Sequence, residues 1–250
     1  QIVRDKLSYN KLEKLQSVYV GDPDKQGDLG LEHFVNPQNS RIHCTLNTVG
    51  AITGRFSAQN PNLMQLPARQ DLYGIRACFH APKGYKLICL DYGQLEIRGM
   101  ALFSREPRMM QVLNDPEGDI HQTTAEEFGV DRSPTAKQLN FLMLYGGGSY
   151  VLAEKLTLEG VPTTPQQAQS YVDRYNQIYP GVKEFRLKLL REHRAEGCIR
   201  LWTGRTRTID DINWDSKSSV HKAETTLSNN CIQALGQDFL KASIVRCDPC

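Results

Sequence analysis

The chain has 250 residues, with 30 Lys and Arg against 28 Asp and Glu, a formal net charge of +2 and 40% hydrophobic residues. This balance excludes a histone-like polycation, and no apolar run approaches the ~18–20 residues that a membrane-spanning helix needs. Seven cysteines without framework spacing indicate reduced thiols, and no signal peptide is visible, so we expect a cytoplasmic protein without membrane contact.

The N-terminal third is poor in long periodic patterns. Residues 1–19 carry a short charged helix pattern, and the stretch 20–66 is rich in Gly, Pro and Asn. Its alternating segments, such as 42–46, predict short strands or extended loops.

A change of pattern follows at residues 86–91. This apolar run is introduced by Pro82 and Gly84 and ends in an aspartate, which predicts a buried strand. A helix is expected to follow over 94–104 and to end before Pro107, because proline interrupts a helix interior.

The middle of the chain is helical. Ser133 followed by Pro134 predicts a helix start, and the glycines at 146–148 predict a stop. The helices expected in this region are 119–128, 133–145, 164–178 and 181–196. The cations of 183–194 are interpreted as a solvated helix face. A hairpin over 201–209 and a last helix over 222–245 complete the pattern. Strands that flank a helical insertion indicate an α+β fold.

Asp91 is the first candidate for chemistry. A carboxylate at the end of a strand suits a hard cation, since Mg²⁺ usually takes one or two carboxylates plus phosphate oxygens. The alternative is structural, because aspartate also commonly ends strands and caps helices.

The second candidate is a row of side chains on the helix after Ser133. Lys137, Phe141 and Tyr145 are four residues apart and therefore share a face. A cation, a ring and a phenol in this order suit a nucleoside triphosphate. The alternative places Phe141 and Tyr145 in the core and leaves Lys137 solvated; spacing alone favours that alternative.

Together the two patterns resemble the polymerase domain of family A DNA polymerases. Asp91-Tyr-Gly-Gln-Leu-Glu-Ile-Arg98 is similar to the family's metal motif, and Lys137-Gln-Leu-Asn-Phe-Leu-Met-Leu-Tyr-Gly146 is similar to its Lys-x3-Phe-x3-Tyr-Gly fingers helix. Further collinear matches are Thr53-Gly-Arg-Phe-Ser57, Pro61-Asn-Leu63, Asp119-Ile-His121, Gly204-Arg-Thr-Arg207, and the helix from Glu224 through Asn229 to Gln233. The matches occur in the family's order over nearly the whole chain.

The chain also departs from the family pattern. The family's arginine four residues before the helix lysine is Ser133 here, with Arg132 one position away. Gly93, Thr225 and Met64 replace a serine, an arginine and a glutamine. The second metal aspartate, in a Val-His-Asp-Glu hairpin, has no counterpart in the 250 residues. We therefore expect a fragment of a longer protein that is inactive as an isolated chain.

The resemblance implies a split palm, with an antiparallel sheet plus helices and a helical fingers insertion. We expect the end of the thumb or a linker at 1–15, the first part of the palm at 16–104, the fingers at 105–209 and a truncated palm helix at 210–250. The implied reaction is two-metal nucleotidyl transfer, in which a primer 3′-hydroxyl attacks a dNTP.

The resemblance also implies site residues and partners. Asp91 and the Tyr92 carbonyl would bind two Mg²⁺ ions, for which Mn²⁺ can substitute, and Lys137 would join Asp91 in catalysis. The implied nucleotide-binding residues are Gln94, Glu96, His121, Arg132, Lys137, Phe141 and Tyr145. The implied DNA-binding residues are Arg55, Asn62, Arg69, Tyr145, Gly146, Arg205, Arg207, Asn229 and Gln233. The partners would be primer–template DNA and dNTPs. We expect the protein to be a monomer that works with replication accessory proteins, and to be located in the nucleoid or in an infected-cell cytoplasm.

Two other functions stay open at the level of sequence. A single-subunit, phage-type RNA polymerase has the same helix lysine and tyrosine, although Glu96 and the segment around Arg55 argue against it. A non-catalytic DNA-binding relative that lost its second aspartate is the alternative from a different functional class.

Overall fold

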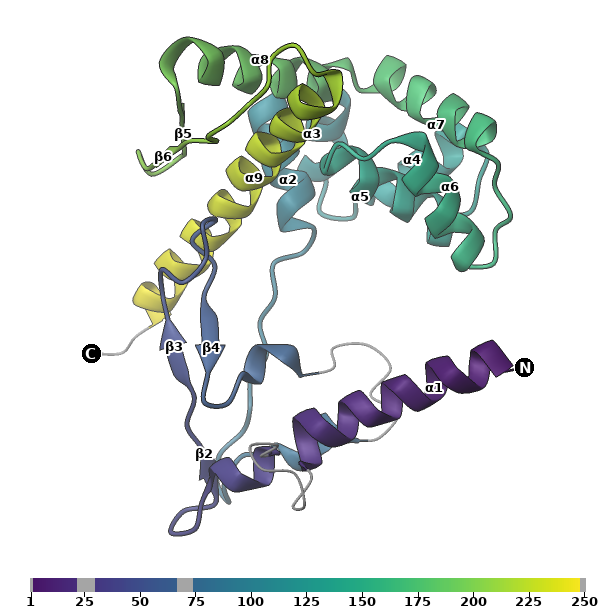
Figure 1. Ribbon diagram of the computed structural model, residues 1–250. Coiled ribbons are helices and arrows are strands. Elements are labelled where there is room, and N and C mark those ends of the chain that lie inside the picture. The colour runs from purple at the N-terminus through teal and green to yellow at the C-terminus, as the bar shows by residue number, and fades with distance from the viewer. Residues whose placement is uncertain (1, 22–29, 67–73, 248–250) are drawn as a thin grey trace. The chain divides into compact units, whose positions relative to one another are not determined.

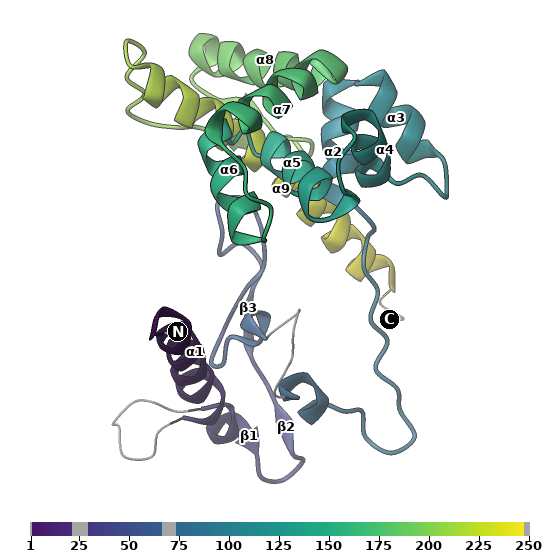
Figure 2. The same ribbon diagram turned by 90° about the vertical axis from the view of Figure 1, so that its right-hand side faces the viewer.

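The computed structural model describes residues 2–21, 30–66 and 74–247 (Figures 1 and 2). By contacts the chain divides into two compact units. One comprises Gln1–Ala51 and Arg55–Asp91, and the other comprises Ile52–Gly54 and Tyr92–Cys250. The bounds expected for palm and fingers stay predictions.

Short elements make up the first unit. Helix α1 continues into a π-helical turn, as the charged pattern predicts, and two antiparallel strand pairs follow. The bounds are α1 Ile2–Leu15, the turn Gln16–Val20, β1 Val35–Asn36, β2 Arg41–Ile42, β3 Thr45–Asn47 and β4 Ser57–Gln59. Single turns of 3₁₀-helix span Leu31–Phe34, Leu63–Gln65 and Ile75–Cys78. Val35 pairs with Ile42, and Leu46 pairs with Ala58.

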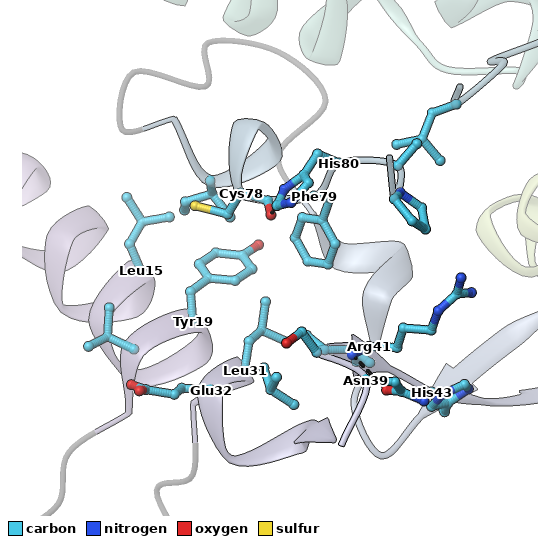
Figure 3. A pocket seen from close by; sticks show the side chains of 18 of the residues that line it. Leu15, Tyr19, Leu31, Glu32, Asn39, Arg41, His43, Cys78, Phe79 and His80 are labelled. Carbon is cyan, nitrogen blue, oxygen red and sulfur yellow. Dashed lines mark hydrogen bonds between the residues drawn. The ribbon is translucent and has the colours of Figure 1, made fainter. Parts of the chain in front are cut away.

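A pocket of about 1050 Å³ lies inside this unit (Figure 3). Leu15, Tyr19, Leu31 and Phe79 contribute its apolar wall, and Arg41 is among its polar lining residues. The Tyr19 hydroxyl donates a hydrogen bond to the Gln65 carbonyl at 2.6 Å. The apolar side chains of this unit thus surround a hollow instead of filling a core.

The prediction of a buried strand at 86–91 is wrong. These residues have no regular secondary structure, and Leu87, Ile88 and Leu90 are 65%, 80% and 87% exposed. A strand is stabilised by a neighbouring strand that pairs with its backbone. No strand in the described ranges pairs with this run, so its apolar pattern has no partner, and Asp91 is exposed.

The second unit is built from eight helices and one hairpin within its described residues (Figure 1). The helices are α2 Leu95–Ser104, α3 Pro107–Asn114, α4 Ile120–Phe128, α5 Lys137–Leu144, α6 Ser149–Leu158, α7 Pro165–Ile178, α8 Pro180–Glu196 and α9 Lys217–Cys247. The hairpin pairs β5 Ile199–Arg200 with β6 Thr206–Arg207. Helix α9 packs against both α2 and α8. Helices with small antiparallel strand pairs confirm the predicted α+β class.

Local signals explain where these helices begin. The Thr164 side chain accepts a hydrogen bond from the Gln167 backbone while the Gln167 side chain binds back to Thr164, so α7 starts with a capping box. Pro107 does interrupt the preceding helix, but as the first residue of α3 it also starts a helix that the sequence analysis missed. Ser133 has extended backbone angles, yet α5 itself begins at Lys137, after a π-helical turn over Arg132–Ala136.

One contiguous core fills the second unit. Its fully buried members come from most of the helices and include Ile97, Met100, Leu139, Met143, Leu152, Leu156, Tyr175 and Ile232. Packing at this density fixes α2, α4, α5 and α9 relative to one another. These four helices carry six of the candidate site residues, namely Glu96, His121, Lys137, Phe141, Asn229 and Gln233. No helix in the described ranges has the length and apolarity needed to cross a membrane.

Candidate functional site

The row of Lys137, Phe141 and Tyr145 lies along one side of α5 and its C-terminal end. All three residues are half-buried, whereas Leu139 and Met143 on the same helix are fully buried. Phe141 and Tyr145 also pack against the core. The rings of Phe141 and Tyr145 therefore pack against the core and keep part of their surface exposed. A role of that exposed surface in nucleotide binding stays a prediction.

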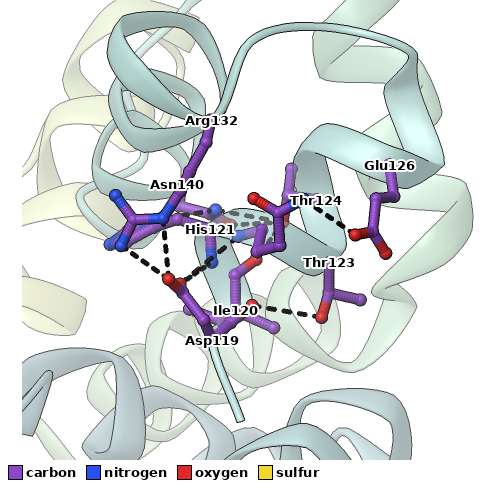
Figure 4. A network of polar contacts seen from close by, with 9 residues as sticks. Asp119, Ile120, His121, Thr123, Thr124, Glu126, Arg132 and Asn140 are labelled. Carbon is purple, nitrogen blue, oxygen red and sulfur yellow. Dashed lines mark hydrogen bonds and ion pairs between the residues drawn. The ribbon is translucent and has the colours of Figure 1, made fainter. Parts of the chain in front are cut away.

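His121 lies beside this row, at the start of α4 (Figure 4). Its ring centroid is 5.6 Å from that of Phe141, and its Nδ1 is 3.1 Å from Nδ2 of Asn140. Burial lowers the pKa of His121 below its usual value; the charge of Asp119 opposes this shift, and those of Arg132 and Lys137 add to it. This shift favours the neutral imidazole at pH 7.

Asp119 joins the start of α4 to the segment before α5 (Figure 4). Its Oδ1 accepts the backbone N–H of His121 at 2.9 Å and that of Gln122 at 3.3 Å. Its Oδ2 accepts a hydrogen bond from Nε of Arg132 at 2.7 Å and forms an ion pair with Nη2 of the same residue at 2.5 Å. Burial by itself raises the pKa of Asp119, but these hydrogen bonds outweigh burial and hold the pKa below its usual value. Arg132 is thus held by Asp119, and its contact with a triphosphate stays a prediction.

Glu96 and Tyr145 connect α2 to the end of α5. The Tyr145 hydroxyl donates a hydrogen bond to Oε2 of Glu96, although the two residues are 49 positions apart. Gln94, just before α2, has left-handed backbone angles (φ 55°, ψ 31°), and its buried Oε1 has no hydrogen-bond partner in the described part of the chain. The structure therefore brings Glu96 into contact with Tyr145 at the end of the α5 row, and the role of Glu96 in nucleotide binding stays a prediction.

The predicted metal ligands do not form a metal centre by themselves. Asp91 ends the first unit and Tyr92 begins the main segment of the second, where its hydroxyl forms a hydrogen bond with Ser243 of α9. Across the described ranges, no three His, Cys, Asp or Glu residues gather in a group that could hold a metal ion. The residues present therefore supply one of the two expected carboxylates and do not fit a complete two-metal site.

The end of α5 rests on a buried cation that the sequence analysis missed. Gly146 has φ +71°, and a Cβ atom on it would lie 2.6 Å from Cγ2 of Thr225 and 2.9 Å from Nη1 of Arg186. Nη1 of Arg186 is 3.4 Å from the Met143 carbonyl oxygen, and its Nε is 3.4 Å from Oε1 of Glu224. Arg186 is only 6% exposed, so at this position the predicted solvated face is wrong.

The predicted DNA-binding residues are distributed over both units. Asn62, in the first unit, accepts the Met64 N–H with its side chain, and Arg55 belongs to the same unit. Arg205 pairs with Asp238 of α9 at 2.7 Å. Arg207, Asn229 and Gln233 are half-buried in the second unit. Arg69 lies outside the described residues.

Comparisons with known proteins cover nearly the whole chain. A family model described as DNA polymerase family A matches residues 1–249. The chain is 33% identical to "DNA polymerase I, thermostable" of Thermus aquaticus over 99% of its own length and 29% of that protein. It is 31% identical to DNA polymerase I of Pseudomonas aeruginosa over 97% of its own length and 26% of that protein.

A solved structure has a similar fold. It is described as the POL domain of Pol1 from M. smegmatis in complex with DNA primer-template and dNTP, with a TM-score of 0.72 and 26% sequence identity. The similarity covers 84% of this chain and 38% of that one. The chain thus spans less than a third of the length of these two curated relatives.

Proposed function

Because this chain belongs to DNA polymerase family A, we propose that it is part of a template-directed DNA polymerase that adds dNTPs to a primer 3′-hydroxyl. The observation that carries the proposal is the grouping of His121, Lys137, Phe141 and the Tyr145–Glu96 pair on α4, α5 and α2. The similar structure whose description includes primer–template DNA and dNTP supports the same ligands.

The dNTP would lie along the exposed side of α5. Lys137 supplies a positive charge and His121 a hydrogen-bond donor for the triphosphate oxygens. Phe141 packs against the sugar and base one helical turn further on, and Tyr145 holds the templating position. Gln94 and Arg132 complete the proposed nucleotide-binding set.

Selection of the sugar would rest on Glu96. The hydrogen bond from Tyr145 orients the Glu96 carboxylate toward the end of α5, where it would exclude a 2′-hydroxyl. An enzyme discriminates by contacts that one substrate satisfies and its competitor cannot. We therefore propose deoxynucleotides as substrates, which disfavours the RNA polymerase alternative.

The reaction is attack of the primer hydroxyl on the α-phosphorus with release of pyrophosphate. Lys137 would neutralise the charge that develops on the leaving group and supply it with a proton. Divalent cations supply Lewis-acid stabilisation in such reactions, and Asp91 with the Tyr92 carbonyl would provide their ligands from this chain. Since the described residues provide only one of the expected carboxylates, we propose that the isolated 250-residue chain has little polymerase activity.

Primer–template DNA would be held mainly through its phosphates, by cations and polar side chains. The proposed contacts are Arg55, Asn62, Arg69, Gly146, Arg205, Arg207, Asn229 and Gln233. Such a protein acts where DNA is, in a nucleoid or an infected-cell cytoplasm.

Binding of dATP tests this proposal without requiring catalysis. Titration of the 250-residue chain with dATP in the presence of a primer–template is expected to show saturable binding that Lys137→Ala weakens about tenfold or more, since a hydrogen bond to a charged group contributes about 1.5–3 kcal/mol. Lys155→Ala is the matched control, because Lys155 is an exposed lysine on the neighbouring helix α6. Equal weakening by both variants would contradict the nucleotide site.

Primer extension separates the proposal from its alternative. The single carboxylate at Asp91 favours a non-catalytic DNA-binding relative as the second candidate. The isolated chain is expected to bind primer–template DNA and to extend it poorly or not at all. Robust extension by these 250 residues would contradict the proposed inactivity and would exclude the non-catalytic alternative.

A further inference from the structure

We propose that Asn140 is a positioning residue that fixes His121 as the neutral tautomer with its proton on Nε2, leaving one N–H to donate to a triphosphate oxygen. The identity of the ligand rests on the proposed function. The tautomer itself rests only on contacts around the imidazole.

Asn140 lies on the buried side of α5, one residue before Phe141, and is 1% exposed (Figure 4). Its Nδ2 is 3.1 Å from Nδ1 of His121 and 3.0 Å from Oγ1 of Thr124. Oγ1 of Thr124 is in turn 2.8 Å from the carbonyl oxygen of Ile120. Three side chains from two helices thus share a short chain of polar contacts.

The direction of each hydrogen bond follows from the number of available protons. A threonine hydroxyl has one proton, and the shortest acceptor for that of Thr124 is the Ile120 carbonyl; the Asn140 Oδ1 is further away, at 3.2 Å. Oγ1 of Thr124 therefore accepts one amide proton from Asn140. The second amide proton points to Nδ1 of His121, which must be the unprotonated nitrogen, so the ring proton is on Nε2.

The opposite amide orientation makes a different prediction. If Oδ1 of Asn140 faced the imidazole, it would accept a proton from Nδ1, and Nε2 would be left as an acceptor. An imidazole with an acceptor on its outer nitrogen could not donate to a phosphate oxygen. The two arrangements are therefore distinguishable by which ring nitrogen carries the proton.

The charges around His121 agree with a neutral ring. The charged groups that act on the ring are Asp119 at the start of α4, Arg132 in the π-helical turn before α5, and Lys137 at the start of α5. Arg132 is already paired with Asp119. Lys137 is the second cation that acts on His121, and it lies one helical turn before Phe141 on α5. Within the proposed site, Lys137 therefore provides charge and His121 provides a directed donor. Protonation of Nδ1 in acid would place its N–H opposite the amide N–H of Asn140. Two donors cannot form a hydrogen bond, so the Asn140 side chain would be displaced.

Two substitutions at Asn140 separate positioning from packing. Asn140→Asp replaces the donor with a carboxylate, which accepts from Nδ1, moves the proton to that nitrogen and raises the pKa of the ring. Asn140→Leu removes the partner, and both tautomers become populated. Asn230→Leu is the matched control, because Asn230 is also buried in a helix, and its Nδ2 binds the Thr226 carbonyl.

The experiment is long-range ¹H–¹⁵N NMR of the histidine rings in the ¹⁵N-labelled 250-residue chain. The His121 signals are identified by their loss in His121→Gln. A wild-type spectrum with an unprotonated Nδ1 and a protonated Nε2, unchanged in Asn230→Leu and altered in Asn140→Asp, is the expected result. A wild-type ring protonated on Nδ1 would overturn the inference. The identification of His121 requires that His121→Gln lose one set of ring signals and keep the others, which also shows that this variant folds.

Addition of dATP distinguishes this inference from the proposed function. A shift of the His121 ring signals on titration with dATP is expected, and it should be smaller in Asn140→Asp. An Nε2-protonated ring that dATP leaves unshifted would exclude the triphosphate contact of the proposed function while the tautomer stands. Failure of the tautomer is seen in the free chain, before dATP is added.

Discussion

The two units of this chain differ in what their apolar residues do. In the second unit they form one contiguous core, and the polar groups among them are mostly paired. In the first unit they line a pocket of about 1050 Å³, and the apolar run at 86–91 is exposed. A helix satisfies its own backbone and needs only one face covered, whereas a strand needs a partner for its backbone as well. The apolar residues therefore fill a core in the helical unit and surround a pocket in the unit of short strands.

The buried ion pair gives the largest expected effect. Arg186→Met leaves the largely buried Glu224 carboxylate with only His221, at 4.0 Å, as a partner, and we expect a loss of about 3–5 kcal/mol in the free energy of unfolding. Lys188→Met, two residues away, breaks only the exposed Lys188–Glu192 pair, with an expected loss below about 0.5 kcal/mol. Urea unfolding followed by circular dichroism measures both. Equal losses would show that burial does not set the strength of these pairs.

Truncation of one leucine in each unit tests the comparison directly. Leu152 is fully buried and Leu87 is 65% exposed. We expect Leu152→Ala to cost about 2–4 kcal/mol through lost burial and the cavity left behind, and Leu87→Ala to change stability by less than about 0.5 kcal/mol. The same urea titrations report both values. A large effect of Leu87→Ala would mean that the run at 86–91 is packed in solution.

Helix capping has a smaller effect. Thr164→Ala removes the side-chain acceptor of the capping box at the start of α7, and a loss of about 1 kcal/mol is expected. Thr164→Gly is the comparison, because glycine at the same position costs only a few tenths of a kcal/mol. Thermal unfolding of the two variants gives the difference. If Thr164→Ala unfolds at the same temperature as the wild type, packing alone fixes the start of α7.

The smallest effect is a pH dependence at the start of α4. The folded-state pKa of Asp119 is lowered, so its pairing contributes stability above the unfolded pKa near 3.8, and this contribution is lost as the pH falls through the lower folded value. Because the Asp119–Arg132 pair is partly exposed, Arg132→Gln should cost about 0.5 kcal/mol at pH 7. The difference from wild type should vanish well below pH 3.8. Acid titrations of both proteins measure it, and a difference that does not decrease as the pH falls below 3.8 would contradict the assignment to Asp119.

Much of the second unit could be predicted from local sequence. The capping residue Thr164 and the glycine stop at 146–148 act within one helical turn, so their effect is visible without knowledge of the fold. Helix α6 was missed because the glycines before it were interpreted only as a stop. The strand at 86–91 could not be judged locally, because its formation depends on a partner elsewhere in the structure.

The candidate site shows the same division. The row on α5 follows from a spacing of four residues, and the resemblance supplied Glu96 and His121. The Asp119–Arg132 pair and the burial of Arg186 could not be predicted, since each depends on how different helices meet. A cation within a charged helix gives no local sign that it lies in the core.

Helix α9 is long, and only part of its length is buried in the core. Its 31 residues, at about 1.5 Å per residue, extend about 46 Å. Its buried residues lie between Ala223 and Gly236, whereas Ile244 and Val245 are exposed. Near that exposed end Ser243 is bonded to Tyr92, and Phe239 stacks with Trp202. Because the buried part of α9 is held in the core, a small tilt of that part would move its exposed end, and with it Tyr92, by a larger distance. The β5–β6 hairpin would move less, since Ile199 and Leu201 are themselves in the core.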